Sequence, residues 1–369
     1  MNVLTIIDSF KGTITSKKLG EIVKEELEAK GHDVDVIPVA DGGDGFCEAI
    51  EDILISKKVK YSKKELSVND PLFRKVDSYY LIANDTKTAY IELAKASGLS
   101  MLSKEELNPL ITSTYGFGEL IKDAIKKGCK KIVLGIGGSA TNDGGCGMLE
   151  ALGVKFYNGN EELIKQINNT DVGTVEYIDD SELKVKIDGI EFVVLSDVTN
   201  PLLGEDGATY VFSPQKGAKK EDLSYLEENL AHFARLNKTH INTPGAGAAG
   251  GVGYALLTYL NAKLYSGIDY ILDFIDYENL ISKYDLIITG EGKIDNQSLS
   301  GKVVFRVSNR SQNKKVIFVC AINELKNIDL NLYNVSAVYS VVGDEVSIDE
   351  SIEKPEYYFR NMIRNMNLE

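Results

Sequence analysis

Residues 120–139 read LIKDAIKKGCKKIVLGIGGS, and this stretch decides the fold class. Four apolar residues share one face of a predicted helix: Leu120, Ile121, Ala124 and Ile125. Gly128 ends that helix, the apolar run 132–136 predicts a buried strand, and Gly-Gly-Ser at 137–139 opens a loop. A helix, a buried strand and a glycine-rich loop in succession are typical of a parallel sheet in an α/β fold.

The same succession recurs towards both ends of the chain. A strand at 3–7 precedes a helix that ends near Gly31, and a strand at 34–39 precedes a helix beginning at Phe46. Further strands are predicted at 192–195, 286–289, 316–320 and 337–342. We therefore expect an α/β protein with a largely parallel sheet.

The segment 61–99 departs from this alternation. Strands at 79–82 and 89–93 flank the turn residues Asn84 and Asp85, which predicts an antiparallel hairpin and with it a second domain. The lysine-rich stretch 56–65 is expected to be a solvated linker.

Length and charge limit the class of protein. At about 150 residues per domain, a chain of 369 residues is expected to form two or three domains. The 41 Lys and Arg residues against 55 Asp and Glu residues give a formal net charge of −14. This charge disfavours non-specific binding to nucleic acid or to anionic membranes, so we expect neither as a partner.

Two further patterns bear on location. Residues 1–8 lack the basic and apolar pattern of a signal peptide, and the glycine-rich stretch 241–262 lacks the apolar density of a membrane helix. The four cysteines form no C-x-x-C pair, and the three histidines show no metal-ligand spacing. We expect a reduced, cytoplasmic protein without structural zinc.

Loops rich in Gly, Asp, Asn and Ser are the main functional signal. They lie at 8–12, 41–45, 137–145, 197–201 and 290–295. Turn formation alone explains any single loop, but four of the five loops contain both an acid and a glycine. Because ligands of parallel α/β sheets bind outside the carboxyl ends of strands, we expect these loops to form a site.

Two glycine-rich loops are candidates for binding phosphate. Loop 137–139 precedes a short helix containing Met148, and loop 244–251 precedes a helix at 254–260. Glycine lets backbone N–H groups approach a phosphate, and a helix N-terminus attracts anions. Tight helix packing is the alternative explanation.

Charged residues in the loops point to phosphoryl transfer. The lysines are Lys11, Lys216, Lys293 and Lys302, and the acids are Asp8, Asp41, Asp44, Asp143, Asp197, Glu291 and Asp295. Lysines neutralise an anionic ligand, and carboxylates bind Mg²⁺ or accept a hydroxyl proton. Phosphoryl transfer is catalysed mainly by such positioning and charge neutralisation.

Other nucleotide motifs are absent or weak. Residues 135–140 match the dinucleotide fingerprint loosely, but Gly144, Gly145 and Gly147 interrupt its helix, so NAD(P) is not expected. The sequence contains no G-x-x-x-x-G-K-[ST] P-loop and no protein-kinase motif set.

Nine ordered segments carry a resemblance to a known family. They are 8–12 (DSFKG), 40–45 (ADGGDG), 94–99 (AKASGL), 112–116 (TSTYG), 135–145 (GIGGSATNDGG), 197–202 (DVTNPL), 214–218 (PQKGA), 244–251 (PGAGAAGG), and 289–298 (TGEGKIDNQS) with Gly301 and Lys302. Across nearly its whole length the chain resembles the type-1 glycerate kinases, ATP-dependent enzymes that phosphorylate glycerate.

The resemblance implies a Rossmann-like parallel-sheet domain with a second, mixed α/β domain inserted in it, and an active site in the interdomain cleft. We expect residues 1–60 and 280–369 to form the Rossmann-like domain and residues 61–279 to form the inserted domain. The expected reaction uses ATP and Mg²⁺ to phosphorylate glycerate, with 2-phosphoglycerate favoured over 3-phosphoglycerate as the product.

The same resemblance, together with the loop composition, gives the candidate site. The catalytic candidates are Lys11, Asp197, Asp295 and Lys302, and either Asp197 or Asp295 could act as the base or bind Mg²⁺. The substrate- or phosphate-binding candidates are Asp8, Ser9, Asp41, Gly42, Gly43, Gly137, Gly138, Ser139, Asp143, Lys216, Gly245, Gly247, Gly290, Glu291, Lys293, Gln297 and Ser298.

Two alternatives stay open at this point. Fold and phosphate loops do not fix the acceptor, so a kinase of another small hydroxy acid fits the same features. A non-catalytic ligand-binding protein on this scaffold would be expected to have lost the loop acids, which are present here. The oligomeric state is not readable from the sequence.

Overall fold

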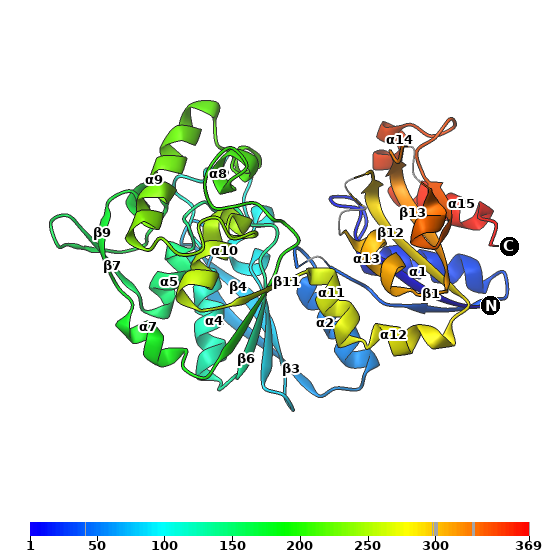
Figure 1. The fold of residues 1–369 in the computed structure, drawn as a ribbon, viewed down its shortest axis with the longest axis horizontal. Coiled ribbons are helices and arrows are strands. Elements are labelled where there is room, and N and C mark those ends of the chain that lie inside the picture. Colours follow the sequence, from blue (N-terminus) through cyan, green and yellow to red (C-terminus); the bar gives the residue numbers. More distant parts are fainter. Residues whose placement is uncertain (41, 297, 299–301, 327–328, 369) are drawn as a thin grey trace. The chain divides into compact units, whose positions relative to one another are not determined.

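The computed structural model describes residues 1–40, 42–296, 298, 302–326 and 329–368 (Figure 1). The chain forms two compact units. Unit 1 comprises Met1–Asp41, Glu48–Ser56 and Gly267–Glu369, and unit 2 comprises Gly42–Cys47 and Lys57–Ser266.

Unit 1 is built on a five-stranded sheet in the order β14-β13-β12-β1-β2, and all of its strand pairs are parallel (Figure 1). Its elements are β1 (Asn2–Ile7), α1 (Ser16–Glu28), β2 (Asp33–Val36), α11 (Gly267–Phe274), α12 (Tyr277–Leu280), β12 (Leu286–Ile294), α13 (Val303–Arg310), β13 (Lys315–Asn323), β14 (Val335–Ser340), α14 (Ile348–Glu353) and α15 (Pro355–Asn365). Helix α2 (Phe46–Ser56) begins in unit 2 and continues in unit 1.

Strand β1, which pairs with β2 on one side and β12 on the other, shows why this sheet is covered on both faces. Successive side chains of a strand point to opposite faces. Leu4 and Ile6 join an apolar cluster with α11 and α13, whereas Val3 and Ile7 join another with α1 and α15. A continuous apolar run is therefore required of β1, as the sequence suggested.

Helices α11 and α12 belong to the core of unit 1. Ile268, Ile271 and Tyr277 pack in the same cluster as Leu4 of β1. The sequence expectation placed residues up to 279 in the inserted domain, but the unit boundary lies between Ser266 and Gly267.

Unit 2 contains a six-stranded sheet in the order β11-β10-β6-β5-β4-β3. Strands β11, β10, β6 and β5 run parallel, whereas β4 pairs antiparallel with both β5 and β3. The elements are β3 (Tyr61–Asn69), β4 (Lys75–Ala83), β5 (Thr88–Glu92), α3 (Ala94–Ser97), α4 (Tyr115–Lys126), β6 (Lys131–Gly135), α5 (Cys146–Leu152), β7 (Lys155–Asn158), β8 (Leu163–Ile164), α6 (Asn169–Val172), β9 (Val175–Asp179), α7 (Ser181–Lys186), β10 (Glu191–Leu195), α8 (Ala208–Phe212), α9 (Leu223–Leu236), α10 (Ala248–Tyr259) and β11 (Lys263–Tyr265).

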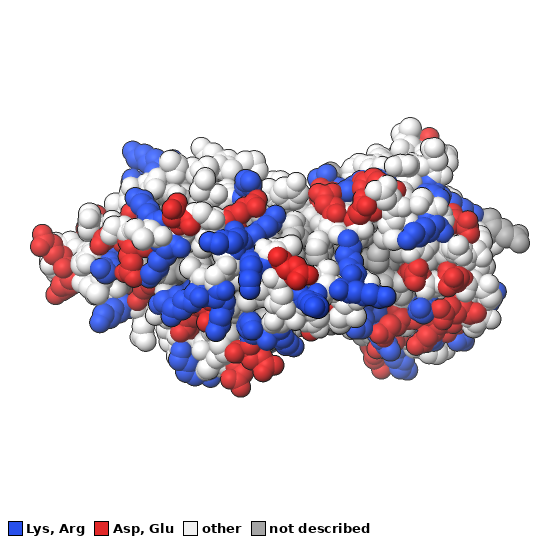
Figure 2. Space-filling model, turned by 90° about the horizontal axis from the view of Figure 1, so that it is seen from below, with Lys and Arg blue, Asp and Glu red and all other residues white. Residues whose placement is uncertain are grey.

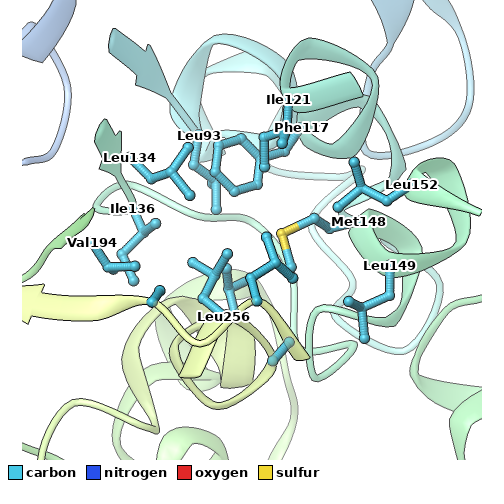
Figure 3. Packing of buried hydrophobic residues seen from close by; sticks show 14 of the residues in the cluster. Leu93, Phe117, Ile121, Leu134, Ile136, Met148, Leu149, Leu152, Val194 and Leu256 are labelled. Carbon is cyan, nitrogen blue, oxygen red and sulfur yellow. The ribbon is translucent and has the colours of Figure 1, made fainter. Parts of the chain in front are cut away.

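One apolar cluster holds unit 2 together (Figure 3). Leu134 and Ile136 from β6 and the loop after it lie close to Phe117 of α4, Met148 of α5 and Leu256 of α10. The strand at 132–136 and the helix stripe at 120–125, which opened the sequence analysis, both lie in this core. The packing fixes the start of the loop that follows β6.

The predicted α/β fold with a parallel sheet and a mixed second sheet is confirmed, and so is the β4–β5 hairpin. Two local expectations differ from the structure. Residues 61–65 form part of edge strand β3 instead of a linker, because their backbone pairs with β4 and exposed side chains alternate with half-buried ones from Lys63 onward. The small antiparallel sheet β8-β7-β9 was not expected, because its strands are very short.

Surface charge is mixed on the face shown in Figure 2, where Lys and Arg side chains lie among Asp and Glu side chains. The formal charge of −14 therefore does not form a continuous acidic surface on that face. Within the described residues, no helix is both long enough and apolar enough to cross a membrane.

Candidate active site

The loop after β6 is shaped by close contact with the segment before α2. The Gly137 N–H donates to the Gly42 carbonyl at 3.0 Å. A Cβ on Gly137 would lie 2.5 Å from the Gly43 Cα, so a larger residue there would push the two backbones apart. The predicted candidates Gly42, Gly43 and Gly137 therefore meet at the carboxyl end of β6.

Two successive N–H groups of this loop remain available. Gly138 has a φ of 72°, and its carbonyl accepts from the Leu99 N–H at 2.8 Å. Among the described residues, the N–H groups of Gly138 and Ser139 donate to no protein acceptor. Successive free N–H groups beside a left-handed residue form concave anion sites, so this loop has the geometry of a phosphate cradle.

Lys216 lies under the same loop. It ends the short 3₁₀ helix Pro214–Lys216 and is only 2% exposed. Its Nζ donates to Ser139 Oγ and to the Thr141 carbonyl, each at 2.7 Å. Burial lowers the pKa of the Lys216 ammonium to about 7, against a smaller opposite effect of Asp143.

Asp143 is fully buried and holds neighbouring backbone in place. Its Oδ2 accepts from the N–H and the hydroxyl of Thr114 and from the Gly147 N–H, and its Oδ1 accepts from the Gly145 N–H. Burial raises the pKa of this carboxyl, while these hydrogen bonds act in the opposite direction. We expected Asp143 to bind substrate, but the protein already occupies its oxygens, which gives it a structural role here.

Asp197 follows β10, the neighbour of β6 on the parallel part of the sheet. Its side chain is exposed, as expected for a residue that meets a ligand or a metal ion. The carbonyl of Leu195, two residues earlier, lies against Gly42. Asp197 and the Gly137 loop thus follow adjacent strands at the same sheet edge.

One glycine of the second predicted phosphate loop is packed tightly against a neighbouring segment. Gly245 and Gly247 are buried, and the Gly247 N–H donates to the Asn200 carbonyl at 2.9 Å. Gly144 donates in turn to the Gly250 carbonyl at 3.0 Å. Packing, the alternative stated for this loop, explains Gly247, because its N–H already has an acceptor and does not serve a phosphate.

In unit 1, Asp8 and Ser9 follow strand β1. The Asp8 N–H donates to the Gly290 carbonyl at 2.8 Å, and the Asp8 carboxylate accepts from the Ser9 N–H at 2.7 Å. Lys11 lies in the turn closed by the hydrogen bonds between Phe10 and Ile14, and its side chain is exposed. The end of β1 thus brings Asp8, Ser9 and Gly290 together.

The end of β12 adds a charged cluster. Lys302 Nζ lies 3.8 Å from Glu291 Oε2, 4.0 Å from Asp295 Oδ1 and 3.3 Å from Ser298 Oγ. Asp295 Oδ1 also accepts from the Ser298 N–H at 3.0 Å. Lys293 pairs with Glu324 at 2.7 Å and lies 3.9 Å from Asp295. The predicted residues of this loop are therefore neighbours in space.

Glu291 is the buried member of this cluster. Among the described residues, its Oε1 has no hydrogen-bond partner. Burial raises the pKa of Glu291, whereas Ser298, Lys302 and Lys11 act to lower it. A carboxyl group that the protein solvates incompletely has capacity for a ligand.

Two predicted residues, Asp41 and Gln297, lie outside the described residues. Within the described ranges, no three Asp, Glu, His or Cys side chains are close enough together to hold a metal ion. A dedicated metal cage is not needed for Mg²⁺ at a nucleotide, because one or two carboxylates usually join the phosphate oxygens as ligands. Exposed Asp197 fits that donor set.

Sequence reasoning missed three supporting residues. Thr114 holds Asp143, Glu92 accepts from the Gly45 and Cys47 N–H groups at 3.3 and 3.0 Å, and Ser16 donates to the Ile7 carbonyl at 2.6 Å. Each fixes a loop at a strand end. In the sequence, each of these residues is visible only as a polar residue within an apolar segment or a segment that matches the family. Such a pattern does not reveal which group the side chain contacts.

Comparison with known proteins shows the family of the chain. The chain matches the glycerate kinase family over residues 3–368. It belongs to that family. Glycerate kinase of Bacillus subtilis (strain 168) is 36% identical over 375 residues, which span 99% of this chain and 97% of the relative.

Two further members are similarly close. Glycerate 2-kinase of Escherichia coli (strain K12) is 37% identical over 360 residues, covering 95% of this chain and 93% of the relative. A crystal structure of a protein described provisionally as glycerate kinase 2 from Salmonella typhimurium LT2 matches with a TM-score of 0.79 and 33% identity. That match covers 99% of this chain and 96% of the other. The predicted family is confirmed, and the chain is a kinase of this family.

Proposed function

We propose that the chain transfers the γ-phosphoryl group of ATP to the 2-hydroxyl of glycerate and forms 2-phosphoglycerate. Membership of the family supports glycerate as the acceptor. The name of the Escherichia coli relative, glycerate 2-kinase, supports the 2-position.

One structural observation carries the proposal: the pair of available N–H groups at Gly138 and Ser139. They follow β6 at the carboxyl edge of parallel strands, where α/β proteins bind phosphate groups. Donors fixed before the reaction stabilise the charge of a transferring phosphoryl group without reorganisation. We assign these groups to the phosphate chain of the nucleotide or to the group in transfer.

The charged residues take the remaining roles in the proposal. Lys302 and Lys11 offset developing negative charge, and either Asp197 or Asp295 orients and deprotonates the glycerate hydroxyl. The other carboxylate ligates Mg²⁺, which supplies charge neutralisation at the phosphate oxygens. A cytoplasmic location, where ATP is abundant and thiols stay reduced, is part of the proposal and agrees with four free cysteines.

Phosphorus NMR of the reaction products tests this function. Purified protein is incubated with D-glycerate, ATP and MgCl₂, and the product resonance is compared with standards of 2- and 3-phosphoglycerate. We expect 2-phosphoglycerate, and no turnover when EDTA is in excess. Formation of 3-phosphoglycerate would contradict the regiochemistry, and consumption of ATP only with another hydroxy acid would contradict the acceptor.

A further inference from the structure

Lys216 is a basic side chain placed inside the core of unit 2. The side chain is 2% exposed. Lys216 lies in the turn after α8, shortly after Ser213 and Pro214. Burying an unpaired ammonium costs several kcal/mol, so such a group needs compensation. The contacts around Nζ show how this protein provides it.

Both hydrogen-bond acceptors of Lys216 are uncharged. They are Ser139 Oγ and the Thr141 carbonyl. Asp143 is the charged group that acts on Lys216, but its oxygens accept from Thr114, Gly145 and Gly147. Among the described residues, no carboxylate lies within ion-pair distance of Lys216.

The number of acceptors distinguishes two protonation states. An ammonium has three N–H donors, whereas an uncharged amine has two donors and one lone pair. Two acceptors therefore satisfy both donors of an amine and leave one buried N–H of an ammonium unpaired.

We propose that Lys216 is a positioning residue that, as an uncharged amine, fixes the Ser139 hydroxyl and the Thr141 carbonyl and so holds the Gly138 and Ser139 N–H groups in place. The lowered pKa of about 7, caused by burial, agrees with this assignment. The consequence for catalysis rests on the proposed function, whereas the state of the amine does not.

Thermal unfolding over pH tests the uncharged amine directly. The free lysine of an unfolded chain stays protonated to about pH 10.4, so between pH 7.5 and 9.5 only folding releases the proton. Stability of the wild-type chain therefore rises with pH over this range relative to Lys216→Met. We expect the difference in Tm between the two proteins to change by about 3 °C per pH unit.

The control is Lys220→Met, which removes an exposed lysine from the same segment. Its Tm is expected to follow that of the wild type at every pH. A difference between wild type and Lys216→Met that stays constant from pH 7.5 to 9.5 would overturn the proposal, because it would mean that the folded protein keeps Lys216 protonated.

A second measurement does not depend on the folding of a variant. In wild-type protein labelled with ¹³C at lysine Cε, one resonance should titrate near pH 7, well below the other lysines. That resonance should be absent from Lys216→Gln, which serves to assign it. A spectrum in which every lysine titrates above pH 9 would contradict an uncharged amine.

Kinetics test the positioning role. We expect kcat to fall about a hundredfold in Lys216→Met and about tenfold in Ser139→Ala, with KM for glycerate within twofold of wild type. Lys220→Met should keep wild-type kcat. A folded Lys216→Met protein with unchanged kcat would overturn the positioning role, whereas wild-type protein without glycerate kinase activity would contradict only the proposed function.

Discussion

Two lysines from similar polar loops, Lys216 and Lys302, occupy opposite environments. Lys216 is 2% exposed and contacts uncharged oxygens, whereas the Lys302 side chain is 44% exposed and faces the carboxylates of Glu291 and Asp295. Salt screens exposed charges but has little effect on buried hydrogen bonds. The surroundings therefore decide whether a lysine acts through its charge or through its geometry.

The buried acids of the two units also differ in how completely the protein provides hydrogen-bond partners for them. Asp143 accepts four hydrogen bonds from the protein, while Glu291 keeps one oxygen without a partner among the described residues. The protein itself thus satisfies the oxygens of Asp143, whereas Glu291 keeps capacity for a ligand.

The largest effect is expected from Asp143→Ala. The change leaves buried N–H groups of Thr114, Gly145 and Gly147 without an acceptor, which costs about 4 kcal/mol. Calorimetry should show Tm lowered by roughly 10 °C. Asp188→Ala, at an exposed position, is the control and should stay within a degree or so of wild type. Equal Tm values for Asp143→Ala and Asp188→Ala would contradict the claim that the hydrogen bonds of Asp143 stabilise unit 2.

Lys302→Met should reduce activity and leave the fold intact. Loss of a charge that stabilises the transferring phosphoryl group is expected to lower kcat/KM about a hundredfold. Because the side chain is exposed, Tm should barely change. Lys24→Met on α1, which removes an exposed pair with Glu28, is the matched control. Near-normal steady-state kinetics in Lys302→Met would exclude the lysine from the site.

Lys11→Met is expected to have a smaller effect of about tenfold on kcat/KM. Lys11 is exposed and its charge lowers the pKa of Glu291, so its electrostatic influence is partly screened by salt. Raising NaCl from 0.05 to 0.5 M should reduce the difference between wild type and variant. A difference that does not depend on salt would indicate a direct contact of Lys11 with substrate.

The smallest effect is a gain in stability in Glu291→Gln. Burial raises the pKa of Glu291, so the folded state binds a proton more tightly than the unfolded state. This group therefore makes the protein less stable as pH rises through its folded-state pKa. At pH 7.5 the variant should unfold roughly 2 °C higher than wild type, and the gain should disappear below the ordinary pKa of 4.5. A gain that persists at pH 4 would contradict a charge penalty at Glu291.

The sequence predicted the regular elements around the active loops better than the contacts inside them. The strand at 132–136 and its loop followed from apolar runs and glycine, because both are local signals. The bond between Lys216 and Ser139 joins positions far apart in the chain, so no local pattern reveals it. The same holds for the hydrogen bonds between Asp143 and Thr114, the residue that precedes α4.

Candidate residues on loops therefore differ in their structural surroundings, and the composition of a loop does not predict those surroundings. Gly137 and Gly247 have similar neighbours in sequence. Gly137 nevertheless opens a loop in which two N–H groups have no acceptor among the described residues, whereas Gly247 packs against Asn200. Residues 61–65 show the same limit, because lysines indicate exposure but not whether the backbone pairs with β4.

The pairing of β1 with β12 has a consequence for synthesis of the protein. Val3 of β1 pairs with Leu286 of β12. Strand β1 therefore cannot pair with β12 until most of the chain has been translated. Unit 2 is almost continuous from Lys57 to Ser266 and is complete earlier. Domains generally fold as they emerge, so unit 2 folds first while β1, α1 and β2 remain without their sheet. Nascent chains stalled before Leu286 should therefore depend on chaperones to shield the apolar residues of β1.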